Sequence, residues 1–119
     1  LAALKGDLSS VKTMLVAFRE RRDLVIKLLS KIQRMKTNTP MGAFYVFPDV
    51  TYYFGKTDGK TTINSAPELC DYILSKVYVA LMPGDAFGEP HCIRISYATS
   101  RELLIEAIER IKSALAVLY

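Results

Sequence analysis

The amino-acid sequence predicts an α+β fold, in which a small antiparallel or mixed sheet of about three strands packs against helices in the order helix, strand, helix, strand, strand, helix. Apolar residues recur at three- and four-residue spacing in residues 10–35 and 101–118, which is typical of amphipathic helices. Short runs rich in aromatic and β-branched residues, typical of strands, occupy residues 43–47, 77–82 and 92–98. We expect residues 1–119 to form a single domain, because this length suffices for one ordinary core.

Two of the predicted helices carry start signals. Ser65 and Glu68 have the spacing of a capping box, which predicts the start of a short helix reaching Ser75. Thr99 and Glu102 have the same spacing and predict the start of the last helix. The positions expected to face the core on these two helices are Leu69, Tyr72, Ile73, Leu104, Ala107, Ile108, Ile111, Leu115 and Leu118.

The remaining segments complete the expected topology. Residues 49–64 contain two glycines and several threonines and are predicted to form a long loop. The nearly continuous apolar run at residues 77–82 is predicted to be a buried strand that ends at Pro83. Because residues 83–90 are rich in turn-forming residues, we expect the last two strands to pair antiparallel across this connection.

Arg94 is the most informative residue of the third predicted strand. Side chains alternate along a strand, so Arg94 shares one face with the small residues Cys92 and Ser96. A guanidinium taken out of water needs a partner, and its planar donors fit a carboxylate or a phosphate with two parallel hydrogen bonds. The sequence therefore predicts an anion-binding site. The alternatives are that Arg94 lies on the solvent side of an antiparallel sheet, or that it pairs with Glu102 or Glu106.

Composition and charge argue against several classes of function. The net charge of +4 is mild, and the arginines at residues 19–22 are interrupted by Glu20 and followed by Asp23, so we expect no nucleic-acid partner. No apolar run has the length of a membrane span, and the first residues lack the pattern of a signal peptide. We therefore expect no membrane partner.

The cysteines and the single histidine do not form a recognisable reactive site. Cys70 and Cys92 stand far apart, without the spacing of a zinc site or of a secreted disulfide framework, which favours a reducing, cytoplasmic location and no metal site. His91 and Cys92 are adjacent in sequence, and adjacent strand residues point to opposite faces, so we interpret Cys92 as a small core residue. The spacing of Gly84 and Gly88 matches neither the dinucleotide-binding fingerprint nor the P-loop and predicts a turn.

Four blocks of sequence follow one another in a specific order: Phe-Arg-Glu-Arg-Arg-Asp at residues 18–23, Pro-Met-Gly-Ala-Phe-Tyr-Val-Phe at 40–47, Pro-Gly-Asp-Ala-Phe-Gly at 83–88 and Ile-Arg-Ile-Ser-Tyr-Ala at 93–98. Together they closely resemble the C-terminal part of class I aminotransferases, with the aspartate and prephenate aminotransferase branch the most similar. The resemblance extends to the opening residues 2–7 and so covers essentially the whole chain.

This resemblance implies that the chain is the small domain of a fold-type-I enzyme that uses pyridoxal phosphate. In such enzymes the arginine corresponding to Arg94 holds the α-carboxylate of the substrate, and residues matching Phe87 and Gly88 lie near the substrate entrance. The resemblance further implies amino-acid and 2-oxo-acid substrates and a homodimeric parent enzyme. The lysine that binds the cofactor belongs to the large domain, so we expect no catalytic residue and no bound cofactor in this chain.

Two other functions remain open from the sequence. The first alternative is the small domain of another fold-type-I enzyme, such as a lyase or a synthase, because these enzymes need the same carboxylate-binding arginine. A stand-alone anion-binding or interaction module would use the same fold and Arg94 for a different ligand. We also expect that the isolated domain can self-associate through apolar surface that the large domain would cover.

Overall fold

The computed structural model describes residues 1–119 and shows an elongated α+β molecule with extents of 57 × 29 × 22 Å. Its helices are α1, α2, α3 and α4, with two short 3-10 helices, η1 and η2, and five short strands, β1 to β5. In chain order the bounds are α1 Ala2–Lys5, α2 Ser9–Leu29, β1 Tyr45–Val46, η1 Thr51–Tyr53, β2 Lys56–Thr57, β3 Thr62–Ile63, α3 Ala66–Val77, β4 Met82–Pro83, η2 Gly84–Phe87, β5 Ile93–Ser96 and α4 Arg101–Ala116.

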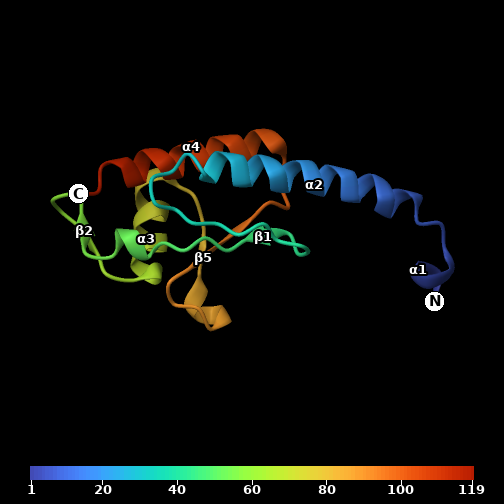
Figure 1. The fold of residues 1–119 in the computed structure, drawn as a ribbon, viewed down its shortest axis with the longest axis horizontal. Coiled ribbons are helices and arrows are strands. Elements are labelled where there is room, and N and C mark those ends of the chain that lie inside the picture. The colour runs from blue at the N-terminus through green and yellow to red at the C-terminus, as the bar shows by residue number, and fades with distance from the viewer.

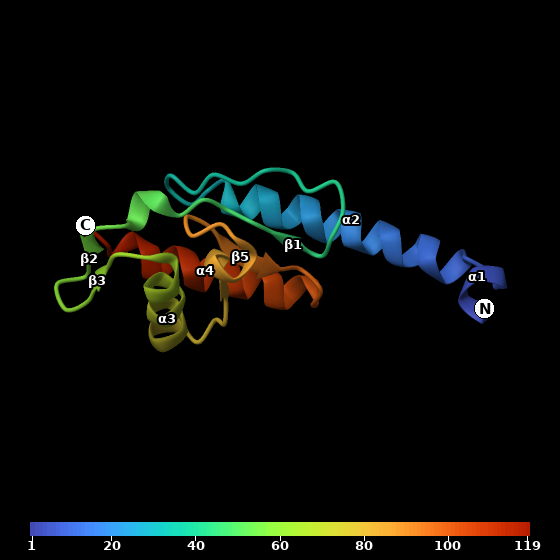
Figure 2. The ribbon, with the colours of Figure 1, turned by 90° about the horizontal axis from the view of Figure 1, so that it is seen from below.

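Helices α2 and α4 lie side by side and cover one face of the central sheet (Figure 1). The sheet has three antiparallel strands in the order β1-β5-β4, so the last two predicted strands pair as expected. Helix α3 packs across the end of α4 and against β3, β4 and η2 (Figure 2). The prediction of a three-stranded sheet packed with helices on one main face is therefore confirmed.

The core lies between the sheet and the helices. All the predicted inward positions on α3 and α4 are buried, except Ala107, which is half-buried. The inward residues of β5, Ile93 and Ile95, lie in the same cluster as Val25 and Leu29 of α2. Burying such aliphatic side chains contributes about 1.5–3 kcal/mol each, so this cluster fixes the orientation of β5 and hence of the residues on its other face.

The first half of α2 and the whole of α1 project beyond the rest of the molecule. The predicted apolar stripe of the first helix is therefore buried only in part: Val25 and Leu29 are fully buried, whereas Met14 and Leu15 are 46% and 47% exposed. A short helix at the N-terminus, α1, was not predicted from the sequence.

Three predicted boundaries need correction. Helix α2 ends at Leu29 rather than near residue 35, because the chain enters turns in which Arg34 adopts a left-handed φ of 62°. The predicted strand at residues 77–82 is wrong over most of its length. Helix α3 continues to Val77, Tyr78 forms its left-handed C-cap, and only Met82 and Pro83 pair as a strand. A short apolar run does not distinguish a helix end from a strand by periodicity alone.

The predicted loop at residues 49–64 also contains regular structure. It forms the 3-10 helix η1 and a small hairpin in which β2 pairs with β3, around an Asp-Gly turn. The two capping predictions have different outcomes. The Ser65 hydroxyl accepts from the Glu68 amide, as predicted, but the cap of α4 is Ser100, not Thr99, because the Ser100 hydroxyl accepts from the Leu103 amide.

Candidate functional site

Arg94 lies in the middle of the central sheet, on the face opposite α2 and α4. β5 is flanked by β1 and β4, and Arg94 pairs in register with Met82 of β4. The predicted alternation is confirmed, because Ile93 and Ile95 are buried against the helices while Arg94 and Ser96 lie on the opposite face. The alternative that placed Arg94 on the outer side of an antiparallel sheet therefore describes its position correctly.

The guanidinium of Arg94 has no acidic partner. The ion pairs of the structure join other residues, and no hydrogen bond uses the Arg94 side chain. The predicted alternative of pairing with Glu102 or Glu106 is therefore wrong: Glu106 pairs with Arg110 one turn along α4, and Glu102 lies at the start of that helix. The guanidinium donors of Arg94 are thus free to meet an anion.

Aromatic rings frame this free guanidinium. The Cζ atom of Arg94 lies 4.6 Å from the centroid of the Phe87 ring and 5.4 Å from that of the Tyr45 ring. Phe47 joins these two rings, because its centroid is 6.5 Å from that of Tyr45 and 6.1 Å from that of Phe87, both in edge-on geometry. Cations within about 6 Å of a ring face are attracted by its quadrupole. We call Tyr45, Phe47 and Phe87 the aromatic frame of Arg94.

The strand register explains why Tyr45, in β1, and Phe47, just after it, reach Arg94. Tyr45 pairs with Ser96 and Val46 with Ile95, so continuing the register places Phe47 opposite Arg94. Residues separated by two along a strand share a face, and neighbours across strands lie about 5 Å apart, with diagonal neighbours still in reach of aromatic side chains. Sequence reasoning missed Tyr45 and Phe47 as site residues. The signal was their alternation around the buried Val46.

A tight loop places Phe87. The Gly84 amide donates to the Cys92 carbonyl oxygen at 2.8 Å, and the Glu89 amide donates to the Gly84 carbonyl oxygen at 3.1 Å. A Cβ atom at Gly84 would lie 2.1 Å from the Glu89 oxygen and 2.5 Å from the Cys92 oxygen, so only glycine fits. Gly88, which has a left-handed φ of 79°, ends η2 directly after Phe87. Phe87 is thereby held over Arg94 although its ring is 47% exposed.

His91 and Cys92 do not form a reactive pair. The His91 ring is exposed, and its Nδ1 atom lies 3.3 Å from the carboxylate of Glu89. The sequence predicted Cys92 to lie in the core, but the residue is only half-buried. Burial, with Glu89 and Asp49 nearby, raises the pKa of its thiol. A raised pKa lowers the thiolate fraction at neutral pH, which is the opposite of what an activated nucleophile needs.

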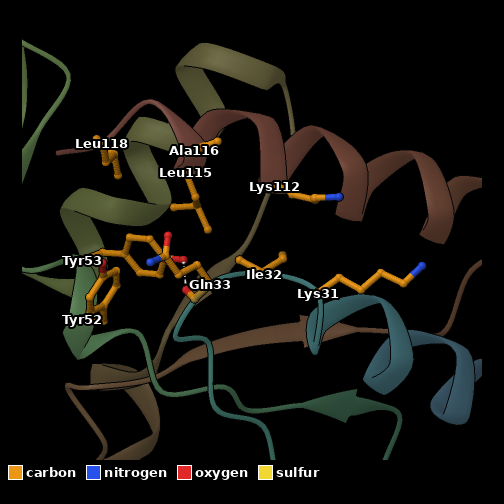
Figure 3. Close-up of a pocket in the computed structure, with 9 residues that line it drawn as sticks. All are labelled: Lys31, Ile32, Gln33, Tyr52, Tyr53, Lys112, Leu115, Ala116 and Leu118. Atoms are coloured by element: carbon orange, nitrogen blue, oxygen red, sulfur yellow. Dashed lines mark hydrogen bonds between the residues drawn. The ribbon is translucent and has the colours of Figure 1, made fainter.

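A separate cavity of about 210 Å³ lies between the C-terminal ends of α2 and α4 and the helix η1 (Figure 3). Apolar side chains, including Ile32 and Leu115, form much of its wall, and the Tyr53 hydroxyl donates to the Gln33 carbonyl oxygen at 2.5 Å. Burial, with Tyr52 alongside, raises the pKa of Tyr53 to about 12, so its hydroxyl remains a donor. Arg94 and the aromatic frame take no part in lining this cavity.

No group of three or more His, Cys, Asp or Glu side chains is arranged to hold a metal ion. None of the helices combines the length and the apolar character required to cross a bilayer. The candidate site of this chain is therefore the outer face of the sheet around Arg94.

Comparison with known proteins identifies the family of this chain. The family model for aminotransferase class I and II matches residues 1–111. The chain belongs to the class I and II aminotransferase family. It is 50% identical over 109 residues to the bifunctional aspartate aminotransferase and glutamate/aspartate-prephenate aminotransferase of Petunia hybrida, covering 91% of this chain and 23% of that protein. It is 45% identical over 117 residues to a probable aspartate/prephenate aminotransferase of Aquifex aeolicus, covering 97% of this chain and 28% of that protein.

A solved aminotransferase structure has the same fold. The aspartate aminotransferase of Rhizobium meliloti superposes with a TM-score of 0.93 at 39% identity, over 99% of this chain and 30% of that chain. The predicted resemblance to the aminotransferases, and to their aspartate and prephenate branch, is thus confirmed. The chain spans about a quarter of the length of the curated aminotransferases it matches.

Proposed function

We propose that residues 1–119 are the C-terminal small domain of a pyridoxal-phosphate-dependent aminotransferase that acts on aspartate or a similar amino acid, and that Arg94 binds the substrate's α-carboxylate. The observation that supports this most is the unpaired guanidinium of Arg94 on an open sheet face. The names of the relatives, aspartate and prephenate aminotransferases, indicate a substrate with a carboxylate on its α-carbon.

Arg94 can orient such a substrate. A guanidinium presents two parallel N–H donors that match the two oxygens of a carboxylate, and this pairing fixes the direction of the group as well as its position. Holding the carboxylate fixes which face of the α-carbon meets the groups that remove its proton, which converts a loose encounter into an oriented one. Gly88 supports this role through the loop conformation and Phe87 through its contact with Arg94.

The residues of this chain do not fit pyridoxal phosphate itself. A lysine that forms the covalent link to the cofactor is activated by desolvation or by a cationic neighbour, and no lysine here is buried. In the proposed enzyme the cofactor supplies the electron sink for the reaction. The lysine and the groups that hold the cofactor phosphate would therefore come from the rest of the parent enzyme, and this chain contributes the substrate-facing arginine.

The decisive experiment is Arg94→Lys in the full-length enzyme. Lysine keeps the charge but loses the bidentate geometry, so the KM for the amino donor should rise about tenfold or more while the absorption spectrum of the bound cofactor stays the same. Arg110→Lys is the matched control, because Arg110 is an exposed arginine paired with Glu106 on α4. An unchanged KM in Arg94→Lys would exclude the carboxylate role.

The competing reactions of the same fold give a different product. An aminotransferase incubated with the amino donor alone should release one equivalent of 2-oxo acid per active site and then stop. A lyase or a synthase would turn over repeatedly or release no 2-oxo acid. The stand-alone module predicts that the native protein binds carboxylates without any upstream cofactor domain.

The apolar surface of α1 and the first half of α2 belongs to the same proposal. Leu4 and Leu8 are 87% and 54% exposed, and Val16 is also exposed. We propose that the rest of the parent enzyme covers this surface, and that the isolated chain self-associates through it. Sedimentation of the isolated chain as a monomer at high concentration would contradict the second part. The homodimeric state and the cytoplasmic location of the parent enzyme are further parts of the proposal.

A further inference from the structure

We propose that the aromatic frame positions Arg94 for carboxylate binding, and that Tyr45 and Phe87 are its two principal positioning residues. This inference rests on the proposed carboxylate role of Arg94. It adds to that role a reason why the guanidinium stays in place before any substrate arrives. Tyr45 and Phe87 come from segments 42 residues apart in the chain, β1 and η2, and both rings lie within 5.4 Å of the same Cζ atom.

The aromatic frame can order the Arg94 side chain without occupying its hydrogen-bond donors. An arginine held by a carboxylate of its own protein would be well ordered but its donors would be occupied, whereas an arginine without contacts would sample many rotamers. An aromatic ring attracts the guanidinium through the ring face, and it does not occupy the N–H donors in the plane of the guanidinium. Tyr45 and Phe87 can therefore order Arg94 while its N–H donors stay available.

The three rings form one connected unit with the guanidinium. Phe47 contacts both Tyr45 and Phe87 edge-on, and so links the two rings that face the guanidinium. Edge-on aromatic pairs are favourable beyond the area they bury. Because Phe47 is half-buried and lies opposite Arg94 in the register, it fixes the frame to the sheet. Tyr45 lies in β1 and Phe47 follows directly after that strand, whereas Phe87 is held by the Gly84 loop.

The test uses the full-length enzyme with Tyr45→Leu and Phe87→Leu, each of which keeps an apolar side chain and removes a ring. Two quantities are measured: the KM and kcat for the amino donor, and the Kd of succinate, an unreactive carboxylate that resembles aspartate without its amino group, by calorimetry. A cation–π contact at a partly exposed site corresponds to a factor of about two to five in affinity. We expect the KM and the succinate Kd to rise by this factor, with kcat nearly unchanged.

Two control variants separate the ring from other effects. Tyr45→Phe keeps the ring and loses only the hydroxyl, so it should restore the affinity of the original enzyme. Tyr52→Leu removes a tyrosine of matched exposure, 38% against 39% for Tyr45, which also has a cation over its ring, Lys56 at 4.6 Å, but no contact with Arg94. It should leave both the KM and the succinate Kd unchanged.

A double substitution distinguishes the possible failures. In an Arg94→Ala background, Tyr45→Leu and Phe87→Leu should weaken succinate binding no further, because the group they position is gone. A full additional loss in that background would overturn the positioning role. If Arg94→Ala alone leaves the succinate Kd unchanged, the carboxylate role itself is wrong. Should Tyr45→Leu fail to fold, Phe87→Leu, on an exposed loop, carries the same test.

Discussion

The Tyr97 hydroxyl donates a hydrogen bond to the Ala43 carbonyl oxygen, 3.0 Å away, and so joins the chain just after β5 to the chain just before β1. The Tyr97 amide also donates to the Phe44 carbonyl oxygen at 2.7 Å. These bonds hold the two strands together next to the site, where β1 provides Tyr45 and β5 provides Arg94. In this arrangement Ala43 adopts a left-handed φ of 66°, a conformation that destabilises a residue with a side chain by about 1–2 kcal/mol.

Ala43→Gly should therefore stabilise the protein. Glycine adopts positive φ without the steric penalty, and after allowance for its greater freedom in the unfolded chain a net gain of about 0.5–1 kcal/mol is expected in urea unfolding. Ala107→Gly, in the middle of α4, should have the opposite effect and lose about 1 kcal/mol. A loss of stability in Ala43→Gly would show that the left-handed conformation costs nothing here.

Gly84→Ala should destabilise the protein and also impair the site. The new Cβ atom would overlap the Glu89 and Cys92 carbonyl oxygens, so the loop that carries Phe87 must move. Overpacking of this kind typically costs about 1–3 kcal/mol, measured by chemical denaturation. Gly42→Ala is the matched control, because nothing lies within 4 Å of its Cβ position and its φ is not positive. Equal effects of the two substitutions would contradict this account.

The cap of α4 can be tested directly against the sequence-based expectation. Ser100→Ala removes the hydroxyl that accepts from the Leu103 amide and should cost about 1 kcal/mol of unfolding free energy. Thr99→Ala, at the position that the capping-box spacing indicated, should change the stability by less than about 0.5 kcal/mol. The reverse order of the two thermal melting temperatures would favour Thr99 as the cap.

Acid should weaken the hairpin's link to α3. The Asp58 carboxylate lies 2.8 Å from the Lys76 ammonium, and this contact, together with the amides of Thr61 and Lys60, holds the pKa of Asp58 well below its usual 3.8. A lowered folded-state pKa gives stability that is present above the unfolded pKa of about 3.9 and is lost as the pH falls toward the folded value.

Asp58→Asn should therefore melt below the original protein at pH 7, and the difference should shrink as the pH falls below about 4. Asparagine keeps an oxygen that can accept from the Thr61 amide, so the turn itself is preserved. The Lys76 partner has a raised pKa, and its share of the stability is present below its unfolded value of about 10.4 and is lost only in strong base. A difference in melting temperature that stays constant down to pH 2.5 would contradict the pair.

Local patterns predicted the parts of this fold that depend on neighbouring residues in the chain. The apolar spacing in residues 101–118 identified the buried face of α4, because a helix repeats its contacts every three or four residues. The alternation around Arg94 placed Ile93 and Ile95 in the core, because a strand repeats every two. The same patterns failed at residues 77–82, where α3 continues to Val77 and Tyr78 forms its left-handed C-cap.

For the candidate site, the sequence by itself determined that Arg94 lies on the polar side of a strand, because alternation along a strand is local. It also showed four blocks in an order that resembles the aminotransferases. Only the tertiary structure decided which groups surround it. The register of β1 against β5 brings Tyr45 and Phe47 to Arg94, and the Gly84 loop brings Phe87, whereas Glu102 and Glu106 lie on α4, across the sheet. Long-range pairing is set by the packing of the whole core, which no short segment of the chain encodes.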